Sequence, residues 1–279
     1  MPTSVLFVIT GASRGLGQAI AKVASQTVPN LRAILVARSE RGLVETEEHM
    51  KRQRSHELQQ QVSRYVMDLS DLDRLDTNLD GLFDELRLED NHYDRVILIN
   101  NAGTIGHLGS CLSSPSLADL RGHVDLNITS SLWLSVRFAR FFRQQVRHAS
   151  SSSSPSTHAQ PIITIVNISS LVAIAEFPTM ACYSAGKAAR EKYHVIMAKE
   201  LANDDDGNKI KILNYAPGPL ETDMVTEIRA ADRLDATLKP HFQKQLLHPD
   251  DSAKKLIQLL LSDNFESGAH IDYYDLPAS

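Results

Sequence analysis

Three side chains in one short stretch of this chain could move a proton together: Ser170, Tyr183 and Lys187. Tyr183 stands four residues before Lys187, so a helix would project both side chains from one face. A free phenol has a pKa of about 10, and an ammonium one turn away favours the phenolate and lowers that pKa toward the working range. A serine hydroxyl on a neighbouring loop could hold a substrate oxygen beside the phenol, which indicates acid–base chemistry. The same spacing also fits a half-buried tyrosine beside a solvated lysine, so the surrounding elements have to decide.

The elements that must position these residues alternate along the chain. Short apolar, β-branched runs predict strands over 5–9, 33–36, 64–67, 96–99, 162–166, 210–213 and 271–274. Longer helix-compatible segments lie between them, over 16–27, 42–61, 72–86, 117–146, 183–202 and 250–261. This pattern predicts an α/β fold: a single doubly wound, Rossmann-type domain over 1–279, with a seven-stranded parallel sheet flanked by helices.

Two segments stand outside this alternation. The serine-rich run over about 149–160 is predicted to be a flexible surface insertion, either an ordinary loop or a site of regulatory phosphorylation. The segment 222–248 is polar and compatible with helix, but it has no regular period. A long segment after a late strand of such a sheet commonly covers the ligand cleft, so we expect that position for 222–248.

Composition excludes several classes of protein. The formal net charge of −5 and the isoelectric point near 6.1 argue against a nucleic-acid partner. The chain starts with an apolar run without a basic leader, and no run is long enough to span a membrane. Cys111 and Cys182 are too far apart in sequence to suggest a disulfide framework. We therefore expect a cytoplasmic protein with no membrane partner and no metal site.

A glycine-rich loop joins the first predicted strand to the first predicted helix and reads TGASRGLG. Glycines at such a turn let the backbone approach a pyrophosphate, whose charge the helix N-terminal amides meet. The loop is therefore predicted to bind a dinucleotide through Gly11, Ala12, Ser13, Arg14, Gly15, Leu16 and Gly17.

The cofactor is predicted to be NADP(H). The second strand ends at Arg38 and Ser39, where an acidic residue would favour NAD and an arginine suits a 2′-phosphate. Arg38 could also be a solvated arginine beside Glu40. Further cofactor contacts are expected at the ends of the next two strands, from Asp68, Leu69, Asn101, Ala102 and Gly103.

Together these motifs resemble the short-chain dehydrogenase/reductase family over essentially the whole chain. The resemblance is carried by TGASRGLG, Asp68-Leu69, NNAG, the Ser170/Tyr183/Lys187 set and Pro217-Gly218. It implies catalytic roles for Ser170, Tyr183 and Lys187, with Asn127 completing a tetrad through a bound water. Tyr183 and Lys187 are also expected to contact the cofactor. The resemblance further implies a homodimer formed by the long helices over 117–146 and 183–202. A segment closing over the cofactor is expected at Leu220, Glu221, Thr222, Asp223, Met224 and Val225.

Three segments, 166–171, 214–224 and 267–275, are similar to the sepiapterin reductase group of this family. That group reduces side-chain carbonyls of pterins with NADPH in tetrahydrobiopterin synthesis, and the resemblance implies that Asp272 anchors the pterin. A small-molecule substrate is thus expected to contact Ser169, Ser170, Tyr183, Gly218 and Asp272. The serine-rich insertion and the stretch 176–180 depart from the vertebrate pattern, which leaves the preferred substrate open. The alternatives are a reductase of small diketones, quinones, steroids or other ketones, and a nucleotide-binding protein without catalysis.

Overall fold

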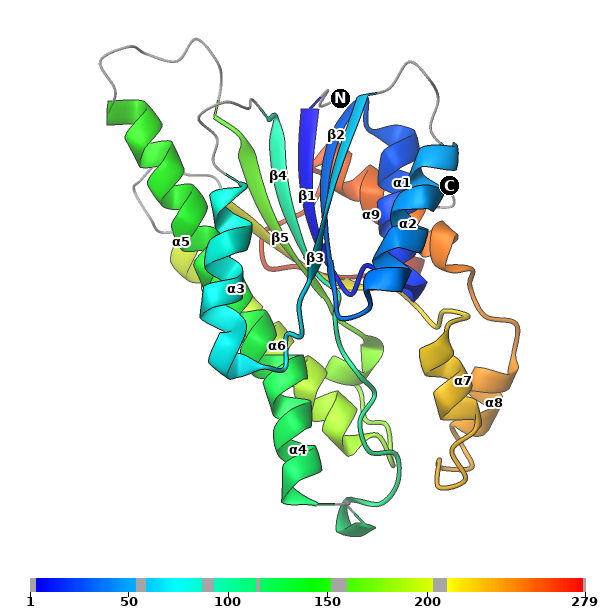
Figure 1. Ribbon diagram of the computed structural model, residues 1–279. Coiled ribbons are helices and arrows are strands. Elements are labelled where there is room, and N and C mark those ends of the chain that lie inside the picture. The colour runs from blue at the N-terminus through cyan, green and yellow to red at the C-terminus, as the bar shows by residue number, and fades with distance from the viewer. Residues whose placement is uncertain are drawn as a thin grey trace.

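Seven parallel strands form one sheet through the middle of the molecule (Figure 1). The computed structural model describes residues 4–53, 59–86, 93–113, 116–151, 160–202 and 210–277. Its strands are β1 (Ser4–Thr10), β2 (Asn30–Ala37), β3 (Gln59–Val66), β4 (Arg95–Asn100), β5 (Ile162–Ile168), β6 (Ile210–Ala216) and β7 (His270–Asp272). They lie in the order β3-β2-β1-β4-β5-β6-β7, which confirms the predicted doubly wound fold. The order reverses between β1 and β4, and ligands of such sheets bind outside the carboxyl ends of the strands at that point.

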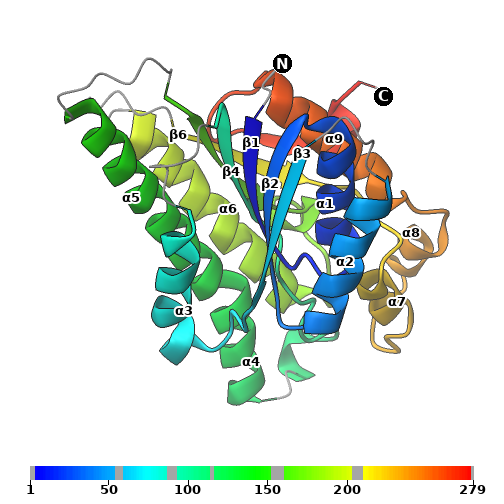
Figure 2. The same cartoon turned by 45° about the horizontal axis from the view of Figure 1, so that its top comes forward.

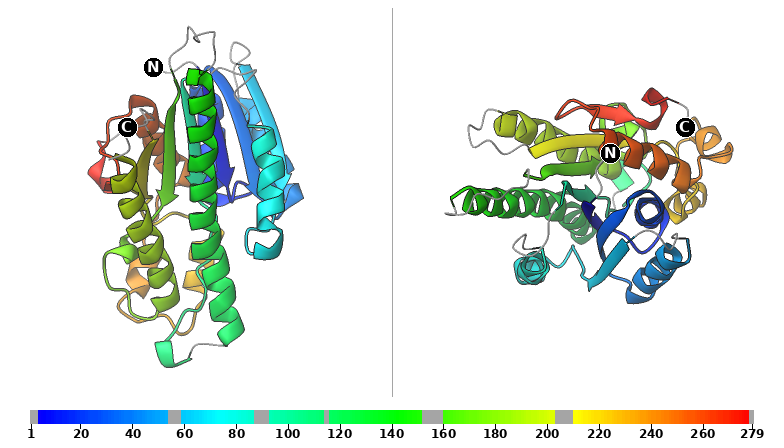
Figure 3. Two further views of the ribbon diagram at one scale, coloured as in Figure 1. Left: turned by 90° about the vertical axis from the view of Figure 1, so that its left-hand side faces the viewer. Right: turned by 90° about the horizontal axis from the view of Figure 1, so that it is seen from above.

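Helices cover both faces of the sheet (Figures 2 and 3). One face carries α1 (Gly15–Thr27), α2 (Glu40–Gln53) and α9 (Pro249–Ser262). The other carries α3 (Leu72–Asp84), α5 (Ser130–Ser151) and α6 (Ala181–Ala202). Three shorter helices, α4 (Leu117–Val124), α7 (Asp223–Arg229) and α8 (Lys239–Gln243), lie beyond the carboxyl ends of the strands.

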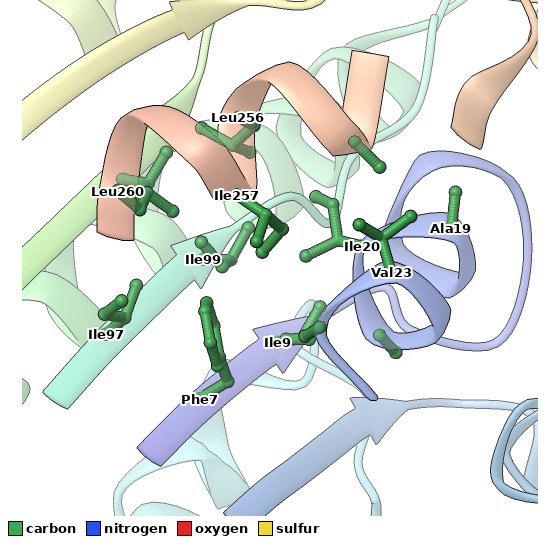
Figure 4. Packing of buried hydrophobic residues seen from close by; sticks show 14 of the residues in the cluster. Phe7, Ile9, Ala19, Ile20, Val23, Ile97, Ile99, Leu256, Ile257 and Leu260 are labelled. Atoms are coloured by element: carbon green, nitrogen blue, oxygen red, sulfur yellow. The ribbon is translucent and has the colours of Figure 1, made fainter. Parts of the chain in front are cut away.

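The strands read as continuous apolar runs because both of their faces are buried. Alternate residues of β1 point to opposite sides, so Phe7 and Ile9 belong to one hydrophobic cluster and Leu6 and Val8 to the other. Figure 4 shows the first cluster, in which strands β1 and β4 pack against α1 and α9. These two clusters fix the strand ends, and with them the loops that carry the site.

The structure corrects two predicted element boundaries. The helix predicted over 42–61 ends at Gln53, and Gln59–Gln61 begin strand β3 instead. These glutamines pair with Asn30–Arg32 of β2 at the edge of the sheet. The helix predicted over 117–146 is interrupted by a π-helical turn at Asp125–Thr129, which separates α4 from α5.

The predicted insertion over 149–160 lies mostly outside the described residues, and only its beginning is seen, as the end of α5. Within the described ranges, no helix is long and apolar enough to cross a bilayer. Among those same residues no cluster of three or more potential metal ligands occurs. Cys111 is exposed and Cys182 is partly buried, and neither forms a disulfide within the described part of the chain.

Candidate active site

The glycine loop after β1 takes backbone conformations that favour glycine. Gly11 and Gly15 have φ angles of 65° and 56°, in the left-handed region. Gly17 is required for a different reason, because a Cβ atom there would lie 2.3 Å from the Gly11 carbonyl oxygen. The close contact seats the first turn of α1 against the loop, with its N-terminal amides facing outward from the strand end.

The turn after β4 is tied directly to the glycine loop. The side-chain amide of Asn101 donates to the carbonyl oxygens of Thr10 at 2.9 Å and Gly11 at 3.2 Å. The Thr10 hydroxyl oxygen in turn accepts from the backbone N–H groups of Asn101 and Ala102, at 3.0 and 3.1 Å. The NNAG turn therefore supports the loop at the point where the strand order reverses.

A cleft of about 1850 Å³ extends from this loop across the carboxyl ends of the strands. Most of the predicted cofactor residues line it: Gly11, Ser13, Arg14, Gly15, Leu16, Arg38, Ser39, Leu69, Asn101, Ala102, Gly103, Tyr183, Lys187 and 220–225. All five predicted substrate residues also line it: Ser169, Ser170, Tyr183, Gly218 and Asp272. Ala12, Gly17, Asp68 and Asn127 are not among the residues that line it, and their predicted roles stay predictions.

The cofactor end of the cleft carries two exposed arginines. Arg38 directly follows β2 and lies 3.8 Å from the carboxylate of Asp68, while Arg14 pairs with Asp223 of α7 at 2.5 Å. Partial burial opposes ionisation of Asp68, but hydrogen bonds from Ser70 and the charge of Arg38 outweigh it and lower the pKa of Asp68. Each arginine side chain is 66% exposed, so both guanidinium groups remain accessible to an anionic group.

Tyr183 and Lys187 lie on the first turns of α6, and Ser170 follows β5. The Lys187 ammonium donates to the carbonyl oxygen of Ile168 at 2.6 Å and lies 5.6 Å from the centre of the Tyr183 ring. Ser170 caps the turn 171–173 and is hydrogen-bonded to Tyr183 through its side chain. The structure thus brings together the three side chains that the sequence spacing singles out.

Their electrostatics differ from the sequence expectation. Burial raises the pKa of Tyr183 to about 12, although the charge of Arg190 and the hydrogen bond from Ser170 act to lower it. Burial and the charge of Arg190 also hold the pKa of Lys187 well below its ordinary value. The predicted lowering of the phenol pKa is therefore wrong for the protein alone, because desolvation outweighs the nearby cation. Tyr183 is protonated at neutral pH, the state in which it can donate a proton.

Asn127 lies in the middle of the π-helical turn and is buried. Its side-chain oxygen accepts from the Thr104 backbone N–H at 2.9 Å, and its amide nitrogen lies 3.0 Å from Nδ1 of His123. The side chain thus links the loop after β4 to α4. Its predicted part in a water relay stays a prediction.

The opposite end of the cleft combines a carboxylate with an apolar wall. Asp272 ends β7, and its carboxylate accepts from the Tyr274 backbone N–H at 3.0 Å while its own N–H donates to Asp275 at 2.8 Å. This reciprocal cap fixes the Asp272 side chain at the cleft wall. A third hydrophobic cluster beside Tyr183 is formed mainly by Ile105, Met180, Ile228, Leu234 and Leu238. The arrangement suits a flat ring with one polar edge.

The segment 221–246 forms part of this wall, and the residues on either side of it lie next to each other. Leu220 and Leu247 form an isolated parallel bridge, in which Leu247 donates to Pro219 and Glu221 donates to Leu247, at 3.0 and 2.9 Å. Both α7 and α8 lie within the excursion closed by this bridge. The sequence predicts that 222–248 covers the cleft, and in the structure several residues of this segment line it.

Sequence reasoning missed two residues next to the site, Glu191 and His270. The Glu191 carboxylate accepts a hydrogen bond from the Ser169 hydroxyl and lies 2.9 Å from Nδ1 of His270. The spacing of each residue could have indicated its place. Glu191 stands one turn after Lys187 on α6, and His270 stands two residues before Asp272 on β7, so each shares a face with a predicted site residue. Only the sheet order shows that the two residues meet.

Comparison with known proteins gives results consistent with this geometry. A family model described as short chain dehydrogenase matches residues 6–233. Sepiapterin reductase from Rattus norvegicus is 35% identical over 280 residues, covering 96% of each chain. Benzil reductase ((S)-benzoin forming) from Bacillus subtilis (strain 168) is 27% identical over 260 residues, covering 91% of this chain and 93% of that one. Among solved structures, the KRED1-Pglu enzyme has a TM-score of 0.75 at 22% identity and covers 96% of this chain and 100% of its own, which shows the shared fold.

Proposed function

The chain belongs to the short-chain dehydrogenase/reductase family, oxidoreductases that use a nicotinamide cofactor, and on that premise we propose that it reduces side-chain carbonyls of pterins with NADPH. The observation that carries the proposal is the pairing of a proton-donating centre with a fixed carboxylate in one cleft. Tyr183 and Ser170 provide the first and Asp272 the second. The similarity to sepiapterin reductases over nearly the full chain supports the same substrate class.

The residues at the cofactor end fit NADP(H). The left-handed glycines, the N-terminus of α1 and the NNAG turn form a surface that a pyrophosphate and a ribose can approach closely. Arg38 and Arg14 would meet a 2′-phosphate at the end of β2, where NAD-binding sites have a carboxylate. When bound, NADPH supplies the hydride.

The chain's own groups supply the proton and the orientation. The Ser170 hydroxyl donates to the substrate carbonyl oxygen and stabilises the charge that develops there. Tyr183, protonated at neutral pH, gives its proton to the same oxygen. The Ile168 carbonyl holds the Lys187 side chain, so that a cationic or strongly polar group lies beside the Tyr183 phenol while the phenol gives up its proton. Asn127 is proposed to assist proton supply from solvent.

Asp272 determines which ring the cleft accepts. A pterin presents an amino group and an adjacent ring N–H on one edge, and a carboxylate can accept from both at once. The apolar cluster that includes Met180 and Ile228 would shelter the ring face beside Tyr183. The side-chain carbonyl then faces Ser170 and Tyr183.

A second candidate is a reductase of small diketones. It is favoured by the similarity to the Bacillus subtilis benzil reductase and by the apolar cluster, which would bind an aromatic ketone without help from Asp272.

A steady-state assay of NADPH oxidation, run with sepiapterin and with benzil, distinguishes the two candidate functions. The pterin proposal predicts efficient turnover of sepiapterin and its loss in Asp272→Asn, while the reduction of benzil by the same variant persists. Turnover of benzil by the native protein without any binding of sepiapterin would replace the first candidate with the second.

The substitution Arg38→Asp tests the proposal that the cofactor is NADP(H). Loss of the cation and gain of a carboxylate should shift the ratio of KM values for NADPH and NADH by roughly tenfold or more toward NADH. An unchanged ratio would contradict the 2′-phosphate role of Arg38.

We also propose a cytoplasmic homodimer that pairs through α5 and α6. Tyr193 and Ile196 stand one turn apart on α6 and are 38% and 43% exposed, which is high for large apolar side chains on a long helix.

A further inference from the structure

Glu191 connects two side chains that come from different strands and reach the same cleft. Its carboxylate accepts from the Ser169 hydroxyl at the end of β5, and both of its oxygens lie 2.9 Å from Nδ1 of His270 at the start of β7. Ser169 and His270 line the cleft, whereas Glu191 lies behind them and is buried. The imidazole is thus fixed from behind, with its ring at the cleft wall.

The hydrogen-bonding partners determine where the protons lie. Partial burial acts to raise the pKa of Glu191, but the hydrogen bonds from His270 and Ser169 outweigh it and the pKa is lowered. An ionised carboxylate only accepts, so Nδ1 of His270 carries a proton that it donates to Glu191. The other ring nitrogen, Nε2, is therefore a donor whenever the imidazole is charged.

His270 and Asp272 stand two residues apart on β7, so their side chains project from the same face. Both line the cleft, and two residues of a strand span about 6.6 Å. The polar edge of a pterin carries, in order, the amino group, the ring N–H and the C4 carbonyl. A carboxylate that accepts from the first two leaves the carbonyl beside it in need of a donor.

We propose that His270, held by Glu191, is a second pterin-binding residue that donates from Nε2 to the ring carbonyl next to the N–H that Asp272 accepts. This assignment rests on the proposed pterin function and deepens it. A ring without that carbonyl, such as benzil, makes no such contact. His270 therefore acts on the choice of substrate and not on the chemistry at Tyr183.

The charged groups around the imidazole favour its protonated form. Glu191 faces it from α6, while Asp272 and Asp275 approach from its own strand and the following turn. Lys187 on the same helix faces Glu191, and its charge acts to lower the pKa of that carboxyl group. The hydrogen bond to Glu191 raises the pKa of His270 against the effect of burial. Pterin affinity should therefore fall as the pH rises through this pKa, while affinity for a diketone does not.

The test compares the native protein with His270→Leu, His270→Gln and His107→Leu. Leucine removes the donor at similar volume, and glutamine offers an amide donor that does not titrate. His107 is a matched control, since it lies 3.3 Å from Ser113 by its imidazole and does not line the cleft. Each protein is titrated with sepiapterin in the presence of NADP, and KM and kcat are measured for sepiapterin and benzil between pH 6 and 9.

The expected result is a rise in the sepiapterin Kd of roughly 10- to 100-fold in His270→Leu, the range for a hydrogen bond from a charged donor. The glutamine variant should recover part of this loss and bind sepiapterin independently of pH, and benzil kinetics should stay as in the native protein. An unchanged sepiapterin Kd in His270→Leu would overturn the assignment, as would an equal rise in the KM for benzil. Failure of the native protein to bind sepiapterin would instead remove the pterin function itself.

Discussion

At the scale of single residues, the site depends on the phenol of Tyr183, whose pKa is higher than the positive charges around it would predict. Tyr183 and Lys187 are both desolvated at the start of α6, and this raises the pKa of the phenol and lowers the pKa of the amine. Both shifts favour the uncharged forms, as burial always does. The protein alone therefore presents Tyr183 as an acid, which is the form that carbonyl reduction consumes.

Replacing Tyr183 with phenylalanine removes this acid and little else. We expect kcat for carbonyl reduction to fall by roughly 100- to 10,000-fold, the usual contribution of a general acid, while the Kd for NADPH changes little. Stopped-flow or steady-state NADPH oxidation and a fluorescence titration measure the two quantities. Tyr65→Phe, on the edge strand β3, is the matched control and should retain full activity. Near-native turnover by Tyr183→Phe would remove Tyr183 from the chemistry.

The Glu191–His270 pair should make stability depend on pH. The pKa of His270 is raised, so its contribution is complete below about pH 6.5, the unfolded value, and is lost as the pH rises through the folded pKa. The pKa of Glu191 is lowered, so its contribution is present above about pH 4.3 and is lost as the pH falls through the folded value. The pair is therefore strongest between these limits.

Urea unfolding of His270→Leu measures this dependence. Near pH 6 the variant should lose about 1.5–3 kcal/mol of unfolding free energy relative to the native protein, the value for a hydrogen bond to a charged group. Near pH 9 the difference should be smaller, because the native imidazole is then neutral. An equal loss at both pH values would attribute the effect to packing and not to the ion pair.

At this scale, the sequence predicts contacts between residues that are close along the chain, but not contacts between residues that are far apart in it. Tyr183 and Lys187 are one helical turn apart, so their spacing alone predicts their proximity. Glu191 and His270 are separated by 79 residues, and they meet only because β5, β6 and β7 are neighbours. The pKa of Tyr183 was out of reach for a related reason: desolvation depends on everything packed around the ring, which no local pattern records.

At the scale of elements, the glycine loop shows that neighbouring glycines serve different purposes. Gly11 and Gly15 supply backbone conformations, whereas Gly17 supplies space between α1 and the loop. The sequence pattern predicts a glycine loop between the first strand and the first helix, which the structure confirms, but it does not distinguish the glycine that packs from those that line the cleft. The boundary between α2 and β3 is missed because Gln59–Gln61 carry no apolar signal and are held by pairing with β2.

Gly17→Ala tests the packing role. Its Cβ would meet the Gly11 carbonyl oxygen at 2.3 Å, so the loop or α1 must move. We expect a loss of stability of about 1–3 kcal/mol from the overpacked contact, together with weaker NADPH binding. Thermal unfolding and NADPH titration measure both effects.

Gly81→Ala is the matched control. Gly81 lies in α3, and a Cβ atom there would meet nothing within 4 Å. Alanine should raise the unfolding free energy by about 0.5–1 kcal/mol, because it has the higher helix propensity. Stabilisation by both substitutions would contradict the close contact at Gly17.

At the scale of the whole molecule, a buried guanidinium joins the centre of the sheet to α6. Arg190 is fully buried and donates to the Asn167 side chain at 2.8 Å and to the carbonyl oxygens of Asn100 at 2.6 Å and Ala102 at 3.2 Å. It therefore holds the NNAG turn and the ends of β4 and β5 in one register with α6, the helix that carries Tyr183 and Lys187. Its charge also reaches Tyr183 and Lys187.

Arg190→Met retains the volume of the side chain and removes these bonds. Three acceptors would lose their donor, two of them in buried bonds, so we expect a destabilisation of about 3 kcal/mol, moderated by the relief of a buried charge. Chemical unfolding gives the value, and NADPH binding should weaken in parallel because the turn beside the cofactor loosens. Arg52→Met, which removes an exposed pair on α2, should change stability by less than about 0.5 kcal/mol. Equal effects of the two substitutions would show that the central network carries little stability.

The bridge between Leu220 and Leu247 makes the substrate wall an exchangeable module. The chain enters and leaves this excursion at adjacent backbone positions beyond β6, so the path from β6 into α9 does not depend on the length of what lies between. Residues 221–225 line the cleft and Asp223 pairs with Arg14 of the glycine loop, so the part open to insertion, deletion or replacement is 226–246. A graft of 226–246 from a relative would therefore change one wall of the cleft while the glycine loop and Tyr183 keep their places, which is a direct route for protein engineering.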